Sequence, residues 1–223
     1  MELSYFSAFL IGLAGAGHCV AMCGGITSML SANVVIKHEK PNINLILGYN
    51  AGRILSYSIA GLIAGVTGSL AIKSIGVHVN WLRVIAAIFL IFLALYIGQW
   101  SFLLTRVEAI GKKLWVKIQP LSKRFIPVSN VKQALMLGAI WGWLPCGLVY
   151  STLTWSMASA NGIDGMFIMM SFGLGTLPAL FTLSQGYGFV SKTLKNNYFR
   201  KVTSIFLLLA GIYSLIIALD LIF

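Results

Sequence analysis

Hydrophobic positions in this chain form long stretches without a charged residue. Five stretches are uninterrupted, and a sixth contains only Arg53. Because a helix needs about 20 mainly apolar residues to cross a bilayer, the pattern predicts a transmembrane helix in each stretch. The stretches are residues 3–36, 41–72, 84–105, 133–163, 165–191 and 202–219.

The composition leads to the same fold class. Of 223 residues, 58% are hydrophobic and 9% are charged, and the mean hydropathy is +0.89. A soluble domain carries roughly 25% charged residues. We therefore expect an all-α integral membrane protein with six transmembrane helices, forming one transmembrane domain over residues 1–223. The first stretch lacks a preceding basic region and exceeds signal-peptide length, which favours a span over a cleaved signal.

The net charge of +11 follows the predicted topology. Lysines and arginines gather after the first, third and fifth stretches, whereas the other connections hold only Lys73 and Arg83. Positive loops mark the cytoplasmic side. We expect both termini on the outer, periplasmic side of a bacterial inner membrane, with lipid as a partner and no nucleic acid. The basic connection, about residues 106–131, is either an amphipathic surface helix or a loop that sets orientation.

The chain aligns with itself at an offset of 123 residues. Cys23 then falls on Cys146, Gly24 on Gly147 and Gly15 on Gly138. Repeat one covers about residues 3–105 and repeat two about 132–222. With three helices each, the second repeat must be inverted in the membrane. Inverted repeats are typical of carriers whose site lies near the bilayer midplane, between the repeats.

Both matched cysteines lie among helix-breaking residues. "GHCVAMCGG" surrounds Cys23 and includes Gly25, and "GWLPCGLVY" contains Pro145 beside Cys146. Proline removes a backbone donor, and breaks at membrane depth occur where protein or water satisfies the freed groups. Close packing of small residues is the structural alternative. The matched pattern favours two redox thiols, because thiolates exchange with disulfides when they are accessible; Cys19 is the additional thiol.

A metal site is the alternative chemistry. Cys19 and Cys23 lie four residues apart, on one helical face, with Met22 between them. Thiolate and thioether ligands select Cu(I), and Cys146 and His18 would complete a low-coordinate site. For His18 alone, the favoured interpretation is a structural imidazole that bonds a backbone carbonyl near the break.

Two further residues in the hydrophobic stretches are candidate supports of the site. Arg53 is costly in a membrane; it either binds carbonyls freed at a break, attracts an anion or thiolate, or extends toward the membrane surface. Pro178 either hinges or merely kinks its helix. Trp141 and Trp143 flank Cys146 and are the tryptophans expected near the site.

Four motifs in order carry a family resemblance: "GHCVAMCGG", "YNAGRILSYSIAG", "WGWLPCGLVYS" and "FGLGTLPALF". Together they resemble the cytochrome c biogenesis transmembrane family, which includes CcdA and the membrane domain of DsbD, in its short UreH-like or sulfite-exporter-like branch. The resemblance implies a six-helix inverted repeat with Cys23 and Cys146 as the redox pair and Pro145 beside the second. This sequence departs from the family pattern, because its first motif contains two cysteines and His18. Members of this branch are also associated with metal handling and copper-oxidase maturation.

Our first hypothesis is a thiol–disulfide carrier without an organic cofactor. It would pass electrons from a cytoplasmic thioredoxin-like reductant to an extracytoplasmic thioredoxin-like or copper-chaperone acceptor, in cytochrome or copper-oxidase maturation. The second is a copper transporter or delivery protein that uses the same cysteines. The third is a structural oxidase-assembly factor in which the cysteines have no chemical role. The first two predict loss of function when Cys146 is replaced, and the third does not.

Overall fold

The computed structural model describes residues 5–15, 43–75, 79–100, 128–144, 146–184 and 197–220, with positions 116 and 120. Helices account for most of these residues, and none of the described residues lies in a strand. The helices are α1 (Tyr5–Ala14), α3 (Ile43–Ile75), α4 (Val79–Ile97), α6 (Val131–Trp141), α7 (Gly147–Ala158), α8 (Gly162–Ser184) and α10 (Asn197–Asp220). The all-α prediction is confirmed for this part of the chain.

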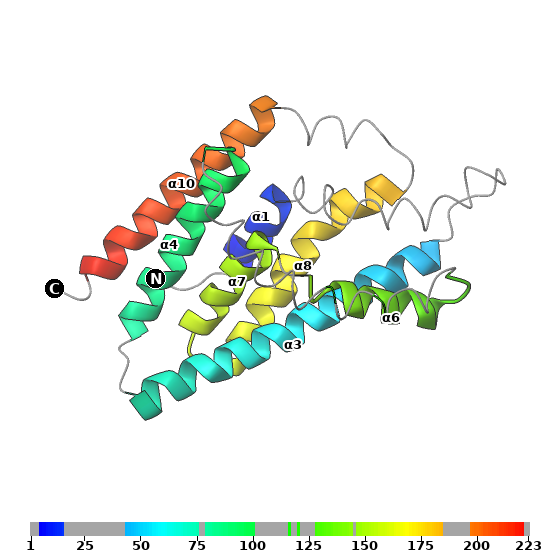
Figure 1. The fold of residues 1–223 in the computed structure, drawn as a ribbon, viewed down its shortest axis with the longest axis horizontal. Helices are drawn as coiled ribbons and strands as arrows, with labels where there is room; N and C mark the ends of the chain where they lie inside the picture. Colours follow the sequence, from blue (N-terminus) through cyan, green and yellow to red (C-terminus); the bar gives the residue numbers. More distant parts are fainter. Residues whose placement is uncertain are drawn as a thin grey trace.

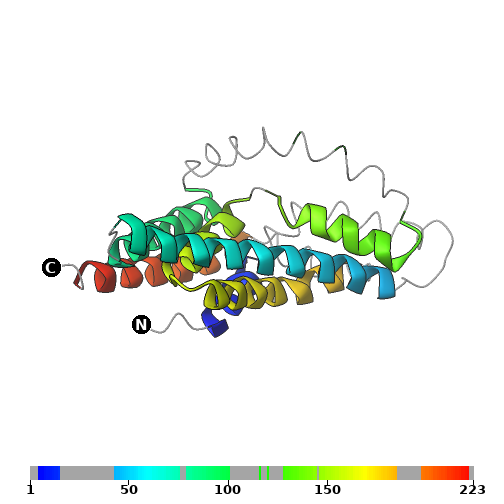
Figure 2. The same ribbon diagram turned by 90° about the horizontal axis from the view of Figure 1, so that it is seen from below.

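The long helix α3 connects most of the bundle. It packs along α8 and α6 and also contacts α7 (Figure 1). Helix α8 also contacts α1, while α4 packs against α10 and α7. Seen from below, α3 runs along the molecule with α6 beside one end and α4 and α10 toward the other (Figure 2). Helices from both predicted repeats therefore alternate through the bundle.

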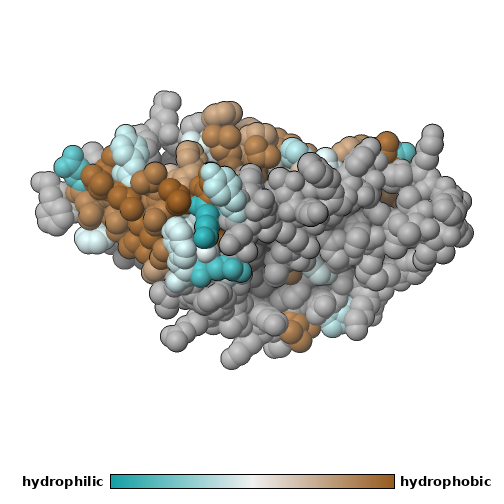
Figure 3. Space-filling view, turned by 90° about the horizontal axis from the view of Figure 1, so that it is seen from above, coloured by the Kyte–Doolittle hydropathy of each residue, from teal (hydrophilic) through white to brown (hydrophobic). Residues whose placement is uncertain are grey.

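Within the described part of the chain, two helices are long and apolar enough to cross a membrane, at Ile43–Ser74 and Gly162–Thr182. Shorter apolar helices cover Tyr5–Ala14, Arg83–Ile97 and Ser204–Asp220. Large apolar side chains are exposed along α10, and they belong to a hydrophobic face of the molecule (Figure 3). Such a surface suits lipid better than water. The six transmembrane spans remain a prediction, because only two of the described helices are long and apolar enough to cross a membrane.

The predicted fourth helix is divided in two. Asn130 begins α6 by accepting the Gln133 N–H at 2.8 Å, and the Gln133 side chain accepts the Ser129 N–H at 2.9 Å, a reciprocal cap. The helix ends at Trp141, and α7 begins at Gly147. The interruption expected near Pro145 is thus present, and it makes two short helices out of residues 133–163.

Helices α1 and α8 approach backbone to backbone through two glycines. A Cβ atom on Gly12 would collide with the carbonyl oxygen of Phe172. A Cβ atom on Gly175 would collide with the carbonyl oxygen of Phe9. Glycine is needed at both positions because nothing larger fits at this crossing.

Helices α3 and α6 form a second crossing of the same kind. A Cβ atom on Gly138 would collide with the carbonyl oxygen of Tyr49. A Cβ atom on Gly52 would collide with that of Leu135. Each crossing therefore joins a first helix of one predicted repeat to the second helix of the other.

The two crossings also correspond in register. Gly175 follows Gly52 by 123 residues, the offset at which the sequence aligns with itself. Gly138, however, follows Gly12 by 126 residues, whereas the sequence alignment matches it with Gly15. The alignment is therefore wrong by three residues at this position, close to one helical turn. The glycine of α1 that allows the close approach to α8 is Gly12.

Candidate functional site

Most of the first predicted motif lies outside the described residues. This applies to His18, Cys19, Met22, Cys23, Gly24 and Gly25, and also to Pro145 and the connection around residues 106–127 apart from two positions. The Cys23–Cys146 pair and the copper set therefore remain predictions. Cys146, Gly147, Arg53 and Pro178 are placed, and the site is built from them.

Cys146 lies immediately after the interruption, as the N-cap residue of α7. Its backbone is extended, with φ −119° and ψ 150°. Its N–H donates to the Leu144 carbonyl at 2.9 Å, and its carbonyl accepts the Tyr150 N–H at 3.1 Å. The side chain is buried, with only 6% of its surface exposed. Backbone contacts on both sides thus hold a buried thiol at a helix terminus.

The start of α7 places the positive end of a helix dipole beside Cys146. The first N–H groups of a helix lack intrahelical acceptors and carry the positive end of its dipole. Gly147, the first residue of α7, is buried and adds no side chain beside the cysteine. The Cys146 side chain therefore lies at a helix N-terminus that is free of neighbouring side-chain bulk at position 147.

Helix α3 stabilises the interruption from behind. The N–H of Trp143, which a continuous helix would direct to Ala139, bonds the Ile140 carbonyl at 3.2 Å. The Ser56 hydroxyl donates to the Ala139 carbonyl at 2.8 Å. A Cβ atom on Gly142 would lie 2.6 Å from the Ser56 Cβ, so the break also packs tightly on α3. Serine here performs the task expected of residues near broken membrane helices.

Arg53 is buried in α3 and does not extend to the surface. Its side chain is 2% exposed, and Nη2 donates to the Tyr57 hydroxyl at 2.9 Å. The guanidinium carbon also lies 5.5 Å from the ring centre of Tyr57 and 6.0 Å from that of Tyr49. Of the three interpretations of Arg53, extension toward the membrane surface is wrong, because aromatic rings enclose its side chain. The carbonyl at the break is bound by Ser56, while attraction of an anion or thiolate stays a prediction.

Tyr57 connects Arg53 to the core that contains Cys146. The rings of Tyr57 and Phe172 lie 5.7 Å apart in a tilted arrangement. Tyr57, Phe172 and Cys146 belong to one cluster of buried residues, which includes parts of α1, α3, α4, α7, α8 and α10. The thiol therefore lies where helices of both predicted repeats meet. The role of Tyr57 was missed, although its spacing of four from Arg53 places both on one helical face.

The remaining predicted supports differ in outcome. Pro178 lies inside α8, which continues from Gly162 to Ser184, so no break separates its two sides. Trp141 packs against the core around Tyr49, whereas Trp143 is 52% exposed and lines a shallow apolar groove beside α3. Neither tryptophan is shown to cover the thiol. Within the described ranges, no three metal-ligating side chains come together.

An apolar helical bundle with a buried cysteine at a helix break defines a membrane protein with a candidate thiol site. The chain belongs to the family of the cytochrome C biogenesis protein transmembrane region, whose model matches residues 7–213. No curated protein and no solved structure gives a significant match. The family match confirms the resemblance and makes this chain a membrane component of cytochrome c biogenesis and thiol–disulfide transport. The match covers α3, α4, α6, α7 and α8 completely and most of α1 and α10.

Proposed function

We propose that this protein carries reducing equivalents across a bacterial inner membrane through Cys23 and Cys146. The observation that carries the proposal is Cys146, a buried thiol at the N-terminus of α7, directly after a helix interruption that Ser56 stabilises. The family supplies the class of reaction. A thioredoxin-like protein in the cytoplasm is the proposed donor, and an outer thioredoxin-like protein or copper chaperone is the proposed acceptor.

The proposed exchange conserves electrons and protons. A thiolate of the reduced donor attacks a Cys23–Cys146 disulfide and forms a mixed disulfide. The second donor thiol displaces the carrier, so the donor leaves oxidised and the carrier holds two thiols. One of these then attacks the acceptor disulfide, and the other resolves the intermediate. Two electrons and two protons pass from donor to acceptor, and the carrier regains its disulfide.

The packing supports an inverted repeat of six membrane helices as the scaffold for this exchange. Gly12 of α1 and Gly138 of α6 each allow close contact with the second helix of the opposite repeat. Matched interfaces of this kind are expected for two three-helix units related by a pseudo-two-fold axis. A site between such units is able to face each side of the membrane in turn. The proposed orientation, with both termini outside, rests on the distribution of basic residues.

The test is a count of thiols in acid-quenched cells, using an alkylating reagent that adds mass. Wild type would be compared with Cys146→Ser, Cys23→Ser and Cys19→Ser, with and without diamide. We expect an internal disulfide that requires Cys23 and Cys146 and survives loss of Cys19. A Cys19–Cys23 disulfide, or none, would refute the proposed carrier.

A measurement of bound copper distinguishes the carrier from the copper-delivery function. Protein purified without oxygen would be analysed for copper, with the Cys19→Ser variant as the matched control. The carrier predicts no stoichiometric copper in either protein. One copper per chain that is lost in Cys19→Ser would instead support the delivery function, with Cys19, Met22, Cys23, Cys146 and His18 as its ligand set.

A further inference from the structure

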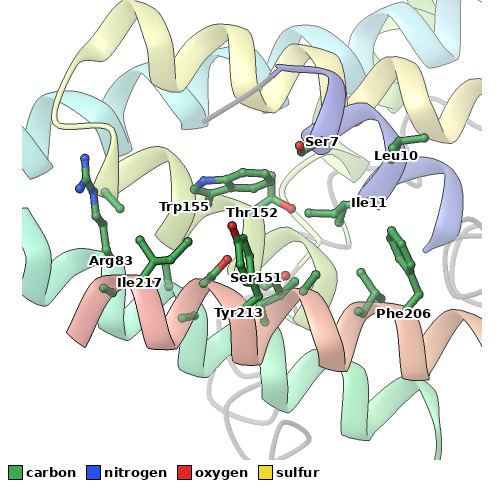
Figure 4. Close-up of a pocket in the computed structure, with 18 residues that line it drawn as sticks. Ser7, Leu10, Ile11, Arg83, Ser151, Thr152, Trp155, Phe206, Tyr213 and Ile217 are labelled. Carbon is green, nitrogen blue, oxygen red and sulfur yellow. The ribbon is translucent and has the colours of Figure 1, made fainter. Parts of the chain in front are cut away.

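A separate cavity of about 300 Å³ lies between α1, α4, α7 and α10. Figure 4 shows it as an elongated space, with Arg83 at one end and Leu10 and Phe206 at the other. Helix α7 contributes one face to its wall through Ser151, Trp155 and neighbouring residues. No role in thiol exchange has been assigned to this space.

The wall of the cavity acts as an apolar surface, although some of its residues carry hydroxyl groups. Ser151 and Thr152 are buried, and each donates its hydroxyl proton to the Leu148 carbonyl at 3.0 Å. Their hydrogen-bond donors are thus used within α7 and do not require a polar ligand. Ile11, Leu207 and several alanines form much of the remaining surface. Such a space favours a hydrocarbon chain over ordered water, which needs two to four polar partners.

Arg83 is the charged group of the cavity. Its Nη1 lies 3.4 Å from Oδ1 of Asn80, at the long limit for a hydrogen bond. Among the described residues, no carboxylate forms an ion pair with Arg83. Its planar guanidinium offers several donors in the fork geometry that suits a phosphate.

We propose that this cavity binds one acyl chain of an anionic phospholipid, with the phosphate of the lipid at Arg83. The apolar lining of the cavity suits the acyl chain, and the positive charge of Arg83 at one end suits the headgroup. Its volume is at the lower limit of ordinary ligand pockets, about 300–1,000 Å³, which suits a single chain. The lipid would connect α10 and α4 to α7, the helix whose N-cap is Cys146.

The test is a lipid titration of the purified full chain, followed by native mass spectrometry. Phosphatidylglycerol and phosphatidylcholine with identical acyl chains share the phosphate and differ in the net charge of the headgroup, so they test whether Arg83 selects an anionic lipid. We expect one tightly bound phosphatidylglycerol, held roughly tenfold more strongly than phosphatidylcholine, as for one charge-assisted contact. Equal affinity for the two lipids would overturn the proposal.

Two substitutions and a matched control locate the site. Arg83→Gln should weaken phosphatidylglycerol about tenfold and phosphatidylcholine less, because the choline cation offsets the charge of its phosphate. Lys73→Gln removes an equal charge from the exposed last turn of α3 and should change neither lipid. Ala210→Phe, which fills the cavity, should weaken both lipids. Equal effects of Arg83→Gln and Lys73→Gln would show nonspecific attraction and refute the site, whether or not Ala210→Phe folds.

Discussion

Replacing Ser56 with alanine should destabilise the interrupted helix that presents Cys146. The substitution removes the 2.8 Å hydrogen bond to the Ala139 carbonyl and keeps the Cβ atom that packs on Gly142. The N–H of Trp143 already bonds Ile140, so restoring a partner for Ala139 requires the backbone to rearrange. The loss is therefore chiefly that of one interhelical hydrogen bond at a buried position.

The expected magnitude follows from two ranges. Hydrogen bonds between membrane helices average about 0.6 kcal/mol, with a maximum near 1.7 kcal/mol. A buried acceptor left without a donor costs about 1–3 kcal/mol. Because Ser56 is almost completely buried, we expect the upper part of the first range, about 1.5 kcal/mol. This corresponds to roughly a tenfold change in the folding equilibrium.

The assay is reversible unfolding in bicelles, with Ser58→Ala as the matched control. Ser58 lies in the same helix, but its hydroxyl donates to Ile54 at 2.9 Å within α3. Its replacement should change the free energy of unfolding by less than about 0.5 kcal/mol. Equal losses for the two variants would refute the conclusion that Ser56 stabilises the break.

Further substitutions test the helix crossing, the turn after α7 and the buried arginine. Gly138→Ala should lower the free energy of unfolding by about 1–3 kcal/mol, because the added Cβ would collide with the Tyr49 carbonyl oxygen in α3. Gly173→Ala is the control: its added Cβ would lie 3.1 Å from the Ile54 side chain, which is able to move. This control should lower the free energy of unfolding less. Ala160 has φ 53°, so Ala160→Gly should raise the melting temperature by about 2–4 °C, and an unchanged or lower value would contradict this strain. Tyr57→Phe should cost about 1.5–3 kcal/mol in the same unfolding assay, because it removes the acceptor of the Arg53 hydrogen bond; a loss below 0.5 kcal/mol would show that this bond is replaceable.

Local sequence patterns predicted the all-α fold of the described residues, because helix formation depends on residues close together in the chain. Long apolar stretches predicted α3 and α8 as membrane-length helices. Proline and glycine beside Cys146 predicted the interruption, since these residues interfere with helical hydrogen bonding wherever the chain folds. The motif resemblance was confirmed by the family match over residues 7–213.

Contacts between helices were less accessible to prediction. Ungapped self-alignment matched Gly138 with Gly15, whereas the crossing uses Gly12. Sequence similarity carries no information about which of two nearby glycines meets the partner backbone. A difference of three residues places a different glycine at the contact, because each helical turn contains 3.6 residues.

The sequence by itself determined that this protein is helical and apolar, with cysteines beside helix-breaking residues, because these are properties of composition and local hydrogen bonding. The tertiary structure decided which groups stabilise the site. Arg53 drew attention as the charged residue, yet Ser56 binds the carbonyl at the break and Tyr57 binds the arginine. Those choices depend on the distance and orientation of side chains on packed helices, and a buried polar group is stable only where the folded chain provides its partner.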